Sequence, residues 1–233
     1  MEEYERYSRQ TMLPQLGPEG QRRLLGARVL IVGVGGLGSA VATYLAGAGV
    51  GHIGLADNDV VSISNLQRQT LYSEAQTGMP KAIAAARRLA DMNSGIRLEP
   101  LCEGFTEANA AELTNRFDLV MDCCDNFATR YLIDDACAAA GRRWVHGALS
   151  EFAGEVTVFN PAEGYRYSRL YPDRDYLCGL PRSVKGVIGA VAGYIGCLQA
   201  CEAIKLIAGF GKPLEGRLLT VDCLEMTTQT IKY

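Results

Sequence analysis

The sequence predicts an α/β protein with a Rossmann-like, largely parallel sheet that carries helices on both faces. Three observations lead to this fold class. Short apolar runs alternate with helical patterns over the first two-thirds of the chain, and a glycine string follows the first run. In the C-terminal third the pattern changes to polar–apolar alternation, which predicts antiparallel strands that extend the sheet. Hydrophobic residues make up 48% and charged residues 21% of the 233 positions, which excludes a disordered chain and a coiled coil.

Strands and helices are predicted to alternate as far as residue 146. Continuous apolar character predicts buried parallel strands at Arg28–Gly33, His52–Ala56, Ile96–Cys102, Asp118–Cys123 and Arg143–His146. Helical spacing predicts the connecting helices at Ser39–Ala48, Lys81–Met92, Ala108–Asn115 and Phe127–Ala140. Pro80 immediately precedes one of these helices, a position that suits the first turn.

The pattern changes after this point. Glu155–Phe159 alternates like a half-exposed strand, a long helix is predicted at Val187–Ala208, and Gly216–Lys232 is typical of a hairpin. Residues 164–185 are irregular, polar and rich in Tyr and Arg, and the length of this segment makes it a candidate active-site crossover or lid. We predict a single domain over residues 1–233, with an N-terminal helical arm at 1–25.

Net charge and hydropathy narrow the class of partners. The formal net charge is −3 and the isoelectric point is near 5.5, which argues against a general nucleic-acid binder. The first residues, MEEYERYSRQ, are charged and contain no apolar h-region, so we expect no secretory signal and a cytoplasmic protein. The longest apolar stretch predicts a buried helix and no membrane span, because four polar residues interrupt it: Tyr194, Gln199, Glu202 and Lys205.

Eight cysteines are expected to be thiols in a reducing compartment, not a disulfide framework. They are Cys102, Cys123, Cys124, Cys137, Cys178, Cys197, Cys201 and Cys223. No C-x-x-C occurs, so their spacing does not match a structural zinc knuckle. Most lie in apolar runs, where a small buried hydrophobe is the expected role.

A glycine string marks a candidate nucleotide site. Gly33, Gly35, Gly36 and Gly38 lie between a predicted strand and a predicted helix, where they allow a tight turn and close approach to phosphates. Asp57 follows the second strand, nineteen residues after Gly38, and suits a carboxylate that accepts ribose hydroxyls. The alternative is that the glycines serve helix–sheet packing alone. These features by themselves also suit a nicotinamide dehydrogenase.

The next segment favours a triphosphate over a dinucleotide. Residues 57–69 read DNDVVSISNLQRQ, and Lys81 follows thirteen residues after Arg68 at a helix start. Two cations and a helix N-terminus near one ribose site exceed what a pyrophosphate requires, and they suit neutralisation while a phosphoanhydride bond breaks. The alternative is that Arg68 and Lys81 are solvated surface charges.

An acidic turn is predicted at the carboxyl end of the fourth strand, where ligands of open parallel sheets bind. Here the sequence reads Asp122-Cys123-Cys124-Asp125-Asn126. Asp125 is placed to hold a magnesium ion carried by the triphosphate. Alternatively, it caps the helix that starts near Phe127, and the two roles are compatible.

Six ordered motifs at compatible spacing resemble one family over nearly the whole chain. They are RYSRQ at 6–10, the glycine string, SNLQRQ at 64–69, GMPK at 78–81, DN at 125–126 and LQACEAIK at 198–205. The chain resembles the ThiF/MoeB/HesA-type adenylyltransferases, which activate ubiquitin-like sulfur carriers for molybdopterin and thiazole biosynthesis, and the core of ubiquitin-activating enzymes. The resemblance implies a nucleotide-binding half at 26–150 and a carrier-binding half at 151–233.

The resemblance also implies a reaction. The C-terminal Gly-Gly carboxylate of a carrier protein attacks the α-phosphate of ATP, which gives an acyl-adenylate and pyrophosphate. The implied ATP-binding residues are Gly33, Gly35, Gly36, Gly38, Asp57, Asp59, Ser64, Asn65, Arg68, Gln69, Lys81, Asp125 and Asn126, and Asp125 would bind magnesium. Arg68, Lys81 and Asp125 are the implied catalytic residues. Arg9 would reach into the partner's site in a homodimer. This chemistry needs positioning and charge neutralisation, not a protein nucleophile.

Two departures from the family matter, the first at the zinc and sulfurtransferase regions and the second at the crossover cysteine. Members with structural zinc carry two C-x-x-C pairs; here the first region reads EGYRYS at 163–168 and the chain stops at Tyr233, so no structural zinc is expected. No rhodanese domain follows, so sulfur would come from a separate donor such as a cysteine desulfurase or rhodanese. Some relatives form a thioester or acyl-disulfide on a crossover cysteine. Cys178 is the candidate, with Arg182 and Lys185 nearby to favour the thiolate, and the alternative is a loop thiol.

Other functions stay open from the sequence alone. One is ATP-dependent activation of a small-molecule, peptide or tRNA-nucleoside carboxylate, although the acidic isoelectric point offers tRNA no docking charge. Another is a non-catalytic nucleotide-binding scaffold. A nicotinamide dehydrogenase is the weakest alternative.

Overall fold

A single sheet organises the chain in the computed structural model, which describes residues 2–181 and 186–233, with side chains from residue 5 onward. Its strands are β1 (Arg28–Val32), β2 (His52–Ala56), β3 (Arg97–Leu101), β4 (Leu119–Asp122), β5 (Trp144–Ser150), β6 (Ala153–Phe159), β7 (Arg217–Asp222) and β8 (Thr227–Lys232). Their order across the sheet is β3-β2-β1-β4-β5-β6-β7-β8. Strands β1 to β5 pair in parallel, and β6, β7 and β8 are added antiparallel. The predicted fold class is therefore confirmed.

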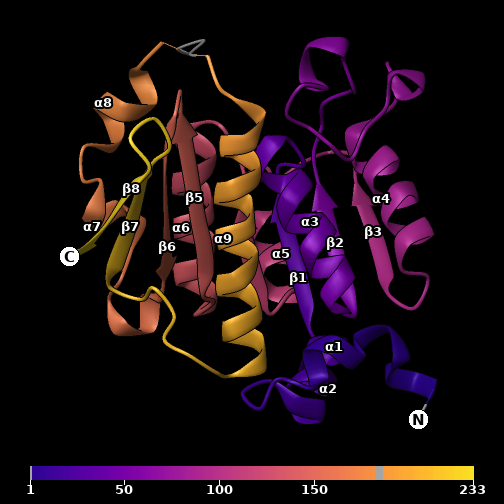
Figure 1. Cartoon of the computed structure of the whole chain (residues 1–233). Coiled ribbons are helices and arrows are strands. Elements are labelled where there is room, and N and C mark those ends of the chain that lie inside the picture. Colours follow the sequence, from indigo (N-terminus) through magenta and orange to yellow (C-terminus); the bar gives the residue numbers. More distant parts are fainter. Residues whose placement is uncertain (1, 182–185) are drawn as a thin grey trace.

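Two layers of helices cover the sheet (Figure 1). The helices are α1 (Ser8–Thr11), α2 (Gly17–Gly26), α3 (Gly36–Ala48), α4 (Lys81–Met92), α5 (Ala110–Arg116), α6 (Phe127–Ala140), α7 (Tyr167–Leu170), α8 (Arg174–Gly179) and α9 (Gly189–Ala208), with short 3₁₀ turns at Glu2–Tyr7, Ile63–Asn65, Glu74–Gln76 and Pro161–Glu163. One apolar core lies beneath α3, α4 and α9, and a second lies on the opposite face beneath α5 and α6.

The predicted elements and the structure agree closely in the first two-thirds of the chain. The strand at His52–Ala56 and the helices at Lys81–Met92 and Phe127–Ala140 have the predicted bounds. One expectation is wrong: the segment 164–185 is not simply irregular, because it contains the short helices α7 and α8. Helices this short carry no sequence periodicity, and α7 is held from outside by a buried carboxylate of α6.

That carboxylate is Asp134, which is fully buried. It accepts the backbone N–H of Tyr167 at 3.0 Å and that of Ser168 at 3.3 Å, the orphan donors at the start of α7. Its Oδ2 also accepts Arg166 Nη2 at 2.9 Å. The first part of the crossover segment is thus anchored on α6 by tertiary contacts.

Helix α9 is long and apolar enough to pass a test for a membrane span by length and composition. In the structure it packs across the sheet and against α3 (Figure 1). Gly196 allows this close approach, since a Cβ there would lie 2.6 Å from the Leu37 carbonyl oxygen. Two buried polar side chains have partners inside the fold: Gln199 Nε2 donates to the Asp122 carbonyl at 2.7 Å, and Glu202 Oε2 accepts the Leu214 N–H at 2.9 Å. These contacts are those of a core helix, as predicted.

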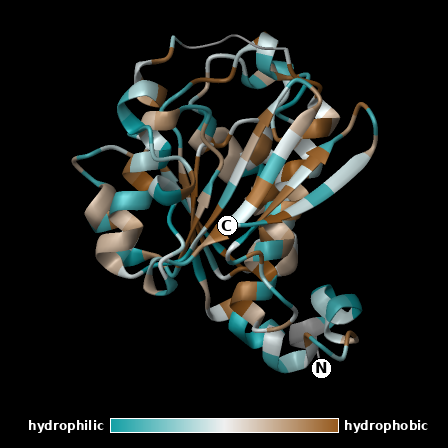
Figure 2. Cartoon of the chain, turned by 90° about the vertical axis from the view of Figure 1, so that its left-hand side faces the viewer, coloured by the Kyte–Doolittle hydropathy of each residue, from teal (hydrophilic) through white to brown (hydrophobic). Residues whose placement is uncertain are grey.

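The N-terminal arm lies at the amino edge of the parallel strands. Figure 2 shows this segment at one end of the molecule, away from the brown apolar strands of the centre. Helix α2 leads directly into β1, and the N–H of Gly51, just before β2, donates to the Leu24 carbonyl at 3.0 Å. The Tyr7 ring packs on Gly49, where a Cβ would be 2.6 Å away. The arm is therefore at the end of the sheet opposite to the candidate site.

Candidate nucleotide site

The carboxyl ends of β1, β2 and β4 bring the predicted site residues to one edge of the sheet. The strand order reverses direction between β1 and β4, which is the switch point where open parallel sheets bind ligands. Two backbone hydrogen bonds hold the ends together: Gly33 N–H to the Ala56 carbonyl at 2.8 Å, and Cys123 N–H to the Val32 carbonyl at 2.9 Å.

The glycine turn has a steric requirement at two positions. Gly33 has φ +88°, and a Cβ there would lie 2.7 Å from the Cys123 carbonyl oxygen. A Cβ on Gly38 would lie 2.1 Å from the Gly33 oxygen. Packing therefore explains these two glycines, as the alternative interpretation expected. Gly36 is also close-packed, since its Cβ would lie 3.0 Å from Ala192 Cβ on α9.

The start of α3 leaves backbone donors available for an anion. Gly35 is the N-cap and makes no side-chain cap, so the amides of the first turn beginning at Gly36 have no intrahelical acceptor. The helix dipole adds positive potential at this end. The first turn of α3 therefore suits a phosphate chemically, in addition to the packing role of the string.

Asp57 fastens the glycine turn to the end of β2. Its Oδ2 accepts the Val34 N–H at 2.7 Å, and its Oδ1 accepts the Asp59 N–H at 2.9 Å. Burial raises the pKa of Asp57, and these two backbone hydrogen bonds oppose that effect. The Tyr72 hydroxyl completes the support by donating to the Val34 carbonyl at 2.7 Å. Each carboxylate oxygen keeps a further lone pair that can accept a ribose hydroxyl.

Lys81 is buried, so its interpretation as a solvated surface charge is wrong. The side chain is 6% exposed, and its Nζ lies 3.0 Å from Asp59 Oδ2, a carboxylate that is 70% exposed. The segment around Asp59 pairs with the start of α4, where Lys81 N–H donates to the Asp59 carbonyl at 2.9 Å. The sheet edge therefore holds a buried ammonium group that is paired with a carboxylate open to solvent.

Arg68 lies beside the glycine turn. Its Nη1 donates to the Ser64 carbonyl at 3.1 Å, and its stem lies 3.6 Å from the position of a Cβ on Gly36. Asn65 is half-buried on the same turn, and its carbonyl accepts the N–H of Arg68 at 3.0 Å. The stem of Arg68 thus lies against the start of α3, and its guanidinium is hydrogen-bonded to the backbone of the preceding turn.

Gln69 borders the glycine turn with a buried polar atom that has no hydrogen-bond partner. It is 4% exposed, and its Oε1 is buried without a partner. Its Nε2 lies 3.5 Å from the position of a Cβ on Gly35, so the amide borders the glycine turn. A buried acceptor left without a donor is costly unless a ligand supplies one. The site therefore fits a ligand with hydroxyl or amino donors, such as a nucleotide.

The turn after β4 carries Asp125 at the same edge. Asn126, and not Asp125, is the N-cap of α6: its Oδ1 accepts the Thr129 N–H at 2.9 Å. The helix-capping alternative for Asp125 is therefore wrong, because the neighbouring amide performs that role. Asp125 is exposed on the turn.

A single carboxylate fits magnesium in the way substrate-borne magnesium is usually held, by one or two carboxylates together with phosphate oxygens. In the described parts, 2–181 and 186–233, no three His, Cys, Asp or Glu side chains gather as a metal cluster. Asp125 would then supply one oxygen and the nucleotide the others. The expectation of no structural zinc stays a prediction.

Two residues that sequence reasoning missed, Arg130 and His146, support this turn together with Asp122. Asp122 is fully buried, and its Oδ1 accepts the Cys124 N–H at 3.1 Å. Arg130 of α6 donates from Nη2 to the Cys124 carbonyl at 3.2 Å, and His146 of β5 meets Asp122 Oδ2 at 2.7 Å. Strand pairing places Asp122 opposite His146 in the β4–β5 register. One sequence does not reveal which residues of two strands lie opposite each other, so this contact could not be predicted.

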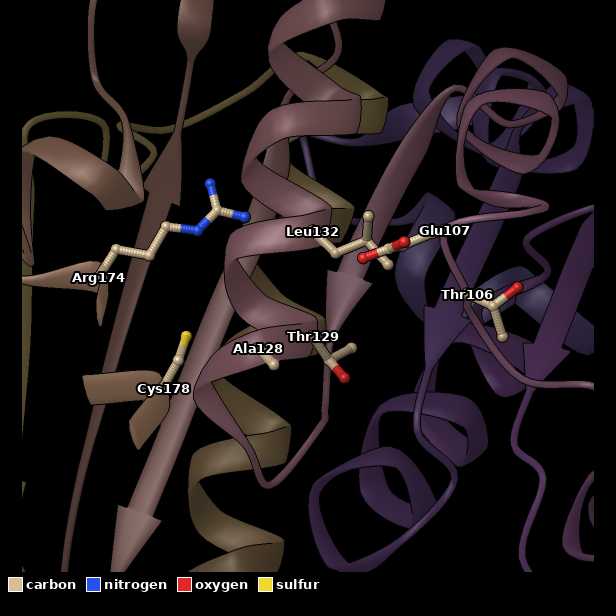
Figure 3. A pocket seen from close by; sticks show the side chains of 7 residues that line it. All are labelled: Thr106, Glu107, Ala128, Thr129, Leu132, Arg174 and Cys178. Carbon is tan, nitrogen blue, oxygen red and sulfur yellow. The ribbon is translucent and has the colours of Figure 1, made fainter. Parts of the chain in front are cut away.

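An open cavity of about 300 Å³ lies beside the first half of α6 (Figure 3). Its lining comes from the first half of α6, from α8 and from the loop after β3: Thr106, Glu107, Ala128, Thr129, Leu132, Arg174 and Cys178. Cys178 is exposed, as predicted, and lies one helical turn from Arg174 on α8. Arg182 and Lys185, the cations predicted to act on its thiol, lie outside the described residues.

All eight cysteines are free, which confirms the prediction of thiols. The expectation that the cysteines are small buried hydrophobes is wrong for Cys102 and Cys201, which are exposed. Only Cys123 and Cys137 are buried, and burial raises the pKa of both thiols. Apolar neighbours in sequence did not reveal which face of each element a thiol occupies.

Arg9 is exposed on α1, at the amino edge of the sheet. The glycine turn and Asp125 lie at the carboxyl edge, so the structure does not bring Arg9 to the other predicted site residues of its own chain.

The chain belongs to the ThiF family, whose model matches residues 7–233. It is 47% identical over 224 residues to "Adenylyltransferase and sulfurtransferase MOCS3" of Bos taurus, covering 96% of this chain and 49% of that protein. It is 44% identical over 230 residues to the "Sulfur carrier protein adenylyltransferase" of Thermus thermophilus, covering 96% of this chain and 85% of that protein. The chain thus spans about half the length of the MOCS3 relatives it matches.

Solved structures share the fold. PaaA matches with a TM-score of 0.85 at 22% identity, covering 99% of this chain and 73% of that one. E. coli MccB with ATP matches with a TM-score of 0.85 at 24% identity, covering 98% and 71%. These likenesses concern the architecture of the sheet and helices.

Proposed function

We propose that the chain is an ATP-dependent adenylyltransferase that activates the C-terminal Gly-Gly carboxylate of a ubiquitin-like sulfur-carrier protein. One observation carries the proposal: Arg68 and the buried Lys81 lie around a glycine turn whose helix has free amides, with Asp125 on the adjacent turn. The relatives named above support the choice of reaction, since 96% of this chain aligns with a sulfur carrier protein adenylyltransferase. The matched half of the MOCS3 relatives would be the half that adenylates.

The chemistry requires little more than positioning and charge neutralisation. The carrier carboxylate attacks the α-phosphorus of ATP, the bond from that phosphorus to the bridging oxygen breaks, and pyrophosphate leaves. The amides of α3 hold the phosphates, Asp57 accepts the ribose hydroxyls, and Arg68 and Lys81 neutralise the leaving group. Asn65, Ser64, Asp59, Gln69 and Asn126 complete the nucleotide contacts. Magnesium held by Asp125 would neutralise phosphate charge.

Two further steps belong to the proposal. Arg9 would act in the site of a second copy, because in its own chain it lies at the opposite edge of the sheet. Cys178 would receive the activated carrier: its thiolate attacks the acyl carbon, a thioester forms, and AMP leaves. The cavity that Cys178 shares with the first turn of α6 supports this step, since that turn directly follows Asp125 and Asn126. A cysteine desulfurase or a rhodanese would supply the sulfur.

Free thiols throughout are typical of a reducing compartment, and we place the enzyme in the cytoplasm on that ground.

Pyrophosphate–ATP exchange with a purified Gly-Gly-ending carrier tests the adenylation step. Wild-type protein should show carrier-dependent exchange, and Arg68→Ala or Asp125→Ala should reduce it by more than about 100-fold, the usual cost of removing a transition-state charge partner. Arg88→Ala and Asp91→Ala on the exposed face of α4 are matched charge controls and should leave exchange unchanged. Exchange that needs a peptide, a small carboxylate or tRNA in place of the carrier would contradict the proposed substrate. Tight ATP binding without exchange would indicate a scaffold, and retained NAD a dehydrogenase.

Subunit mixing tests Arg9. If Arg9 acts in the partner's site, mixing inactive Arg9→Ala and Asp125→Ala chains produces heterodimers in which one site has both wild-type residues, so exchange reappears. If Arg9 acts in its own chain, every site in the mixture lacks one residue and exchange stays absent. Two different affinity tags and sequential purification on both verify that the mixture contains heterodimers.

A further inference from the structure

An acid–imidazole–acid chain with a fully buried imidazole runs through the second core, outside the nucleotide contacts described above. His146 is fully buried on β5, between a carboxylate of β4 and one of β6. Its Nδ1 lies 2.7 Å from Asp122 Oδ2, and its Nε2 lies 3.3 Å from Glu155 Oε1. Arg130 Nε is 3.6 Å from the same Asp122 oxygen. Two acids and two basic groups thus face one another with no net charge.

Geometry determines the protonation state of the ring. A carboxylate can only accept a hydrogen bond, so an imidazole between two carboxylates satisfies both only when both nitrogens carry hydrogen. Burial by itself lowers the pKa of His146, but the hydrogen bonds with Asp122 and Glu155 outweigh it, and the pKa lies above its usual 6.5. The same contacts outweigh burial at both acids, so the pKa values of Asp122 and Glu155 lie below their usual range.

One arm of this chain ends at the turn that carries Asp125. Asp122 is bound by His146 through Oδ2, which leaves Oδ1 to accept the Cys124 N–H at 3.1 Å. Arg130 Nη2 donates a hydrogen bond to the carbonyl of Cys124 at 3.2 Å, so both backbone groups of Cys124 are held. The orientation of the Asp122 carboxylate therefore sets the path of the backbone just before Asp125.

The other arm ends in the crossover segment. Glu155 Oε1 accepts the Tyr171 hydroxyl at 2.6 Å, and Tyr171 lies between α7 and α8. The Tyr171 carbonyl in turn accepts the Tyr131 hydroxyl at 2.6 Å, and its ring lies 4.7 Å from that of Tyr167. Helix α8, which carries Cys178, begins three residues later.

We propose that His146 is a positioning residue that links the Asp125 turn to the crossover segment, with its Nδ1 arm orienting the turn and its Nε2 arm holding the segment through Glu155 and Tyr171. The role of the Asp125 turn rests on the proposed function. The link itself is a property of the fold and is testable without turnover.

Two substitutions separate the arms. In His146→Asn the side-chain amide nitrogen takes the place of Nδ1, so the donor to Asp122 is kept and that to Glu155 is lost. In His146→Gln the amide reaches the place of Nε2, so the donor to Glu155 is kept and that to Asp122 is lost. Tyr171→Phe removes the hydroxyl beyond Glu155 and keeps the ring, which makes it a control for the second arm alone.

Two measurements on the full chain read the arms independently. Calorimetry with magnesium and an ATP analogue that has an α,β-methylene bridge reports the turn, and amide hydrogen exchange over residues 167–179 reports the segment. We expect His146→Gln to weaken analogue binding about tenfold, as loss of an outer-sphere partner typically does. We expect His146→Asn and Tyr171→Phe to bind the analogue like wild type. Their amide hydrogens over residues 167–179 should exchange about tenfold faster, which corresponds to the loss of one hydrogen bond to a charged group.

A merely structural role for His146 would change both readouts together, in parallel with the loss of melting temperature in Asn and Gln variants alike, and that result would overturn the proposal. Unchanged exchange over 167–179 in Tyr171→Phe would overturn the segment arm even if both histidine variants failed to fold. If wild-type protein bound no analogue, the proposed function and the turn arm would fail together, while the exchange experiment would still decide the segment arm.

Discussion

Gly38 lies at a position in the glycine turn where there is no room for a side chain. The first turn of α3 lies directly on the end of β1, so a Cβ at Gly38 would be 2.1 Å from the Gly33 carbonyl oxygen. The obstacle is backbone, which cannot rotate away. Gly47 lies near the other end of the same helix, is exposed, and has nothing within 4 Å of an added Cβ. The same residue type is thus required at one position and dispensable at the other.

Gly38→Ala should therefore destabilise the protein by at least about 2 kcal/mol through overpacking. Gly47→Ala should be neutral or stabilise it by up to about 1 kcal/mol, since alanine loses less backbone entropy in a helix. Urea denaturation followed by circular dichroism measures both. Equal effects of the two substitutions would show that close contact at the end of β1 does not explain Gly38.

Helix α6 is the element on which both the acidic turn and the crossover segment depend. Asn126 caps its start, Arg130 supports the turn before it, and Asp134 caps α7 from its buried face. Asp135 is the next residue but is about half exposed, with ion pairs to Arg166 and Arg174 at the surface. The two adjacent carboxylates of α6 should therefore contribute very different amounts to the stability of the protein.

Asp134→Ala should cost about 3 kcal/mol, because Arg166 and two backbone donors lose a buried acceptor. Asp135→Ala should cost less than about 1 kcal/mol, as exposed ion pairs do. Urea denaturation gives the free energies of unfolding, and hydrogen exchange of the amides of α7 should rise in the first variant alone. Similar free-energy losses in the two variants would refute the assignment of the anchoring to Asp134.

Across the whole molecule, the two histidines predict opposite dependences of stability on pH. The pKa of His146 is raised, so the folded state holds its proton more tightly than the unfolded chain does. The resulting contribution of His146 to the free energy of unfolding is fully present below pH 6.5, the unperturbed pKa. It is lost as pH rises through the raised pKa. The pKa of His52 is lowered by burial, which outweighs its hydrogen bond with Glu99. The contribution of neutral His52 to the free energy of unfolding is present above pH 6.5 and is lost as pH falls through the lowered pKa.

The stability lost in His146→Asn should accordingly be greatest below pH 6.5 and shrink at higher pH. His52→Asn is the matched control, and its effect should change with pH in the opposite direction. Melting temperatures of the three proteins between pH 5 and 9 measure both slopes. Parallel curves for wild type and His146→Asn would show that the ring is not held as an imidazolium.

At the scale of residues and motifs, the sequence was enough to predict the family and to propose the site residues. The glycine string, SNLQRQ, Lys81 and Asp125 were assigned to one site because the carboxyl ends of parallel strands meet at one edge. The local signals of helix and strand also sufficed for the parallel half, since continuous apolar runs and helical periodicity are properties of neighbouring residues. The family followed from the order of the motifs.

Only the tertiary structure decided what depends on contacts between distant residues. It showed that Lys81 is buried, that Asn126 and not Asp125 caps α6, and that Cys102 and Cys201 are exposed. It also revealed the chain from Asp122 through His146 and Glu155 to Tyr171, whose members come from three strands and the crossover segment. Strand register and the burial of a charge are set by packing across the sheet, and no local pattern in one sequence encodes them.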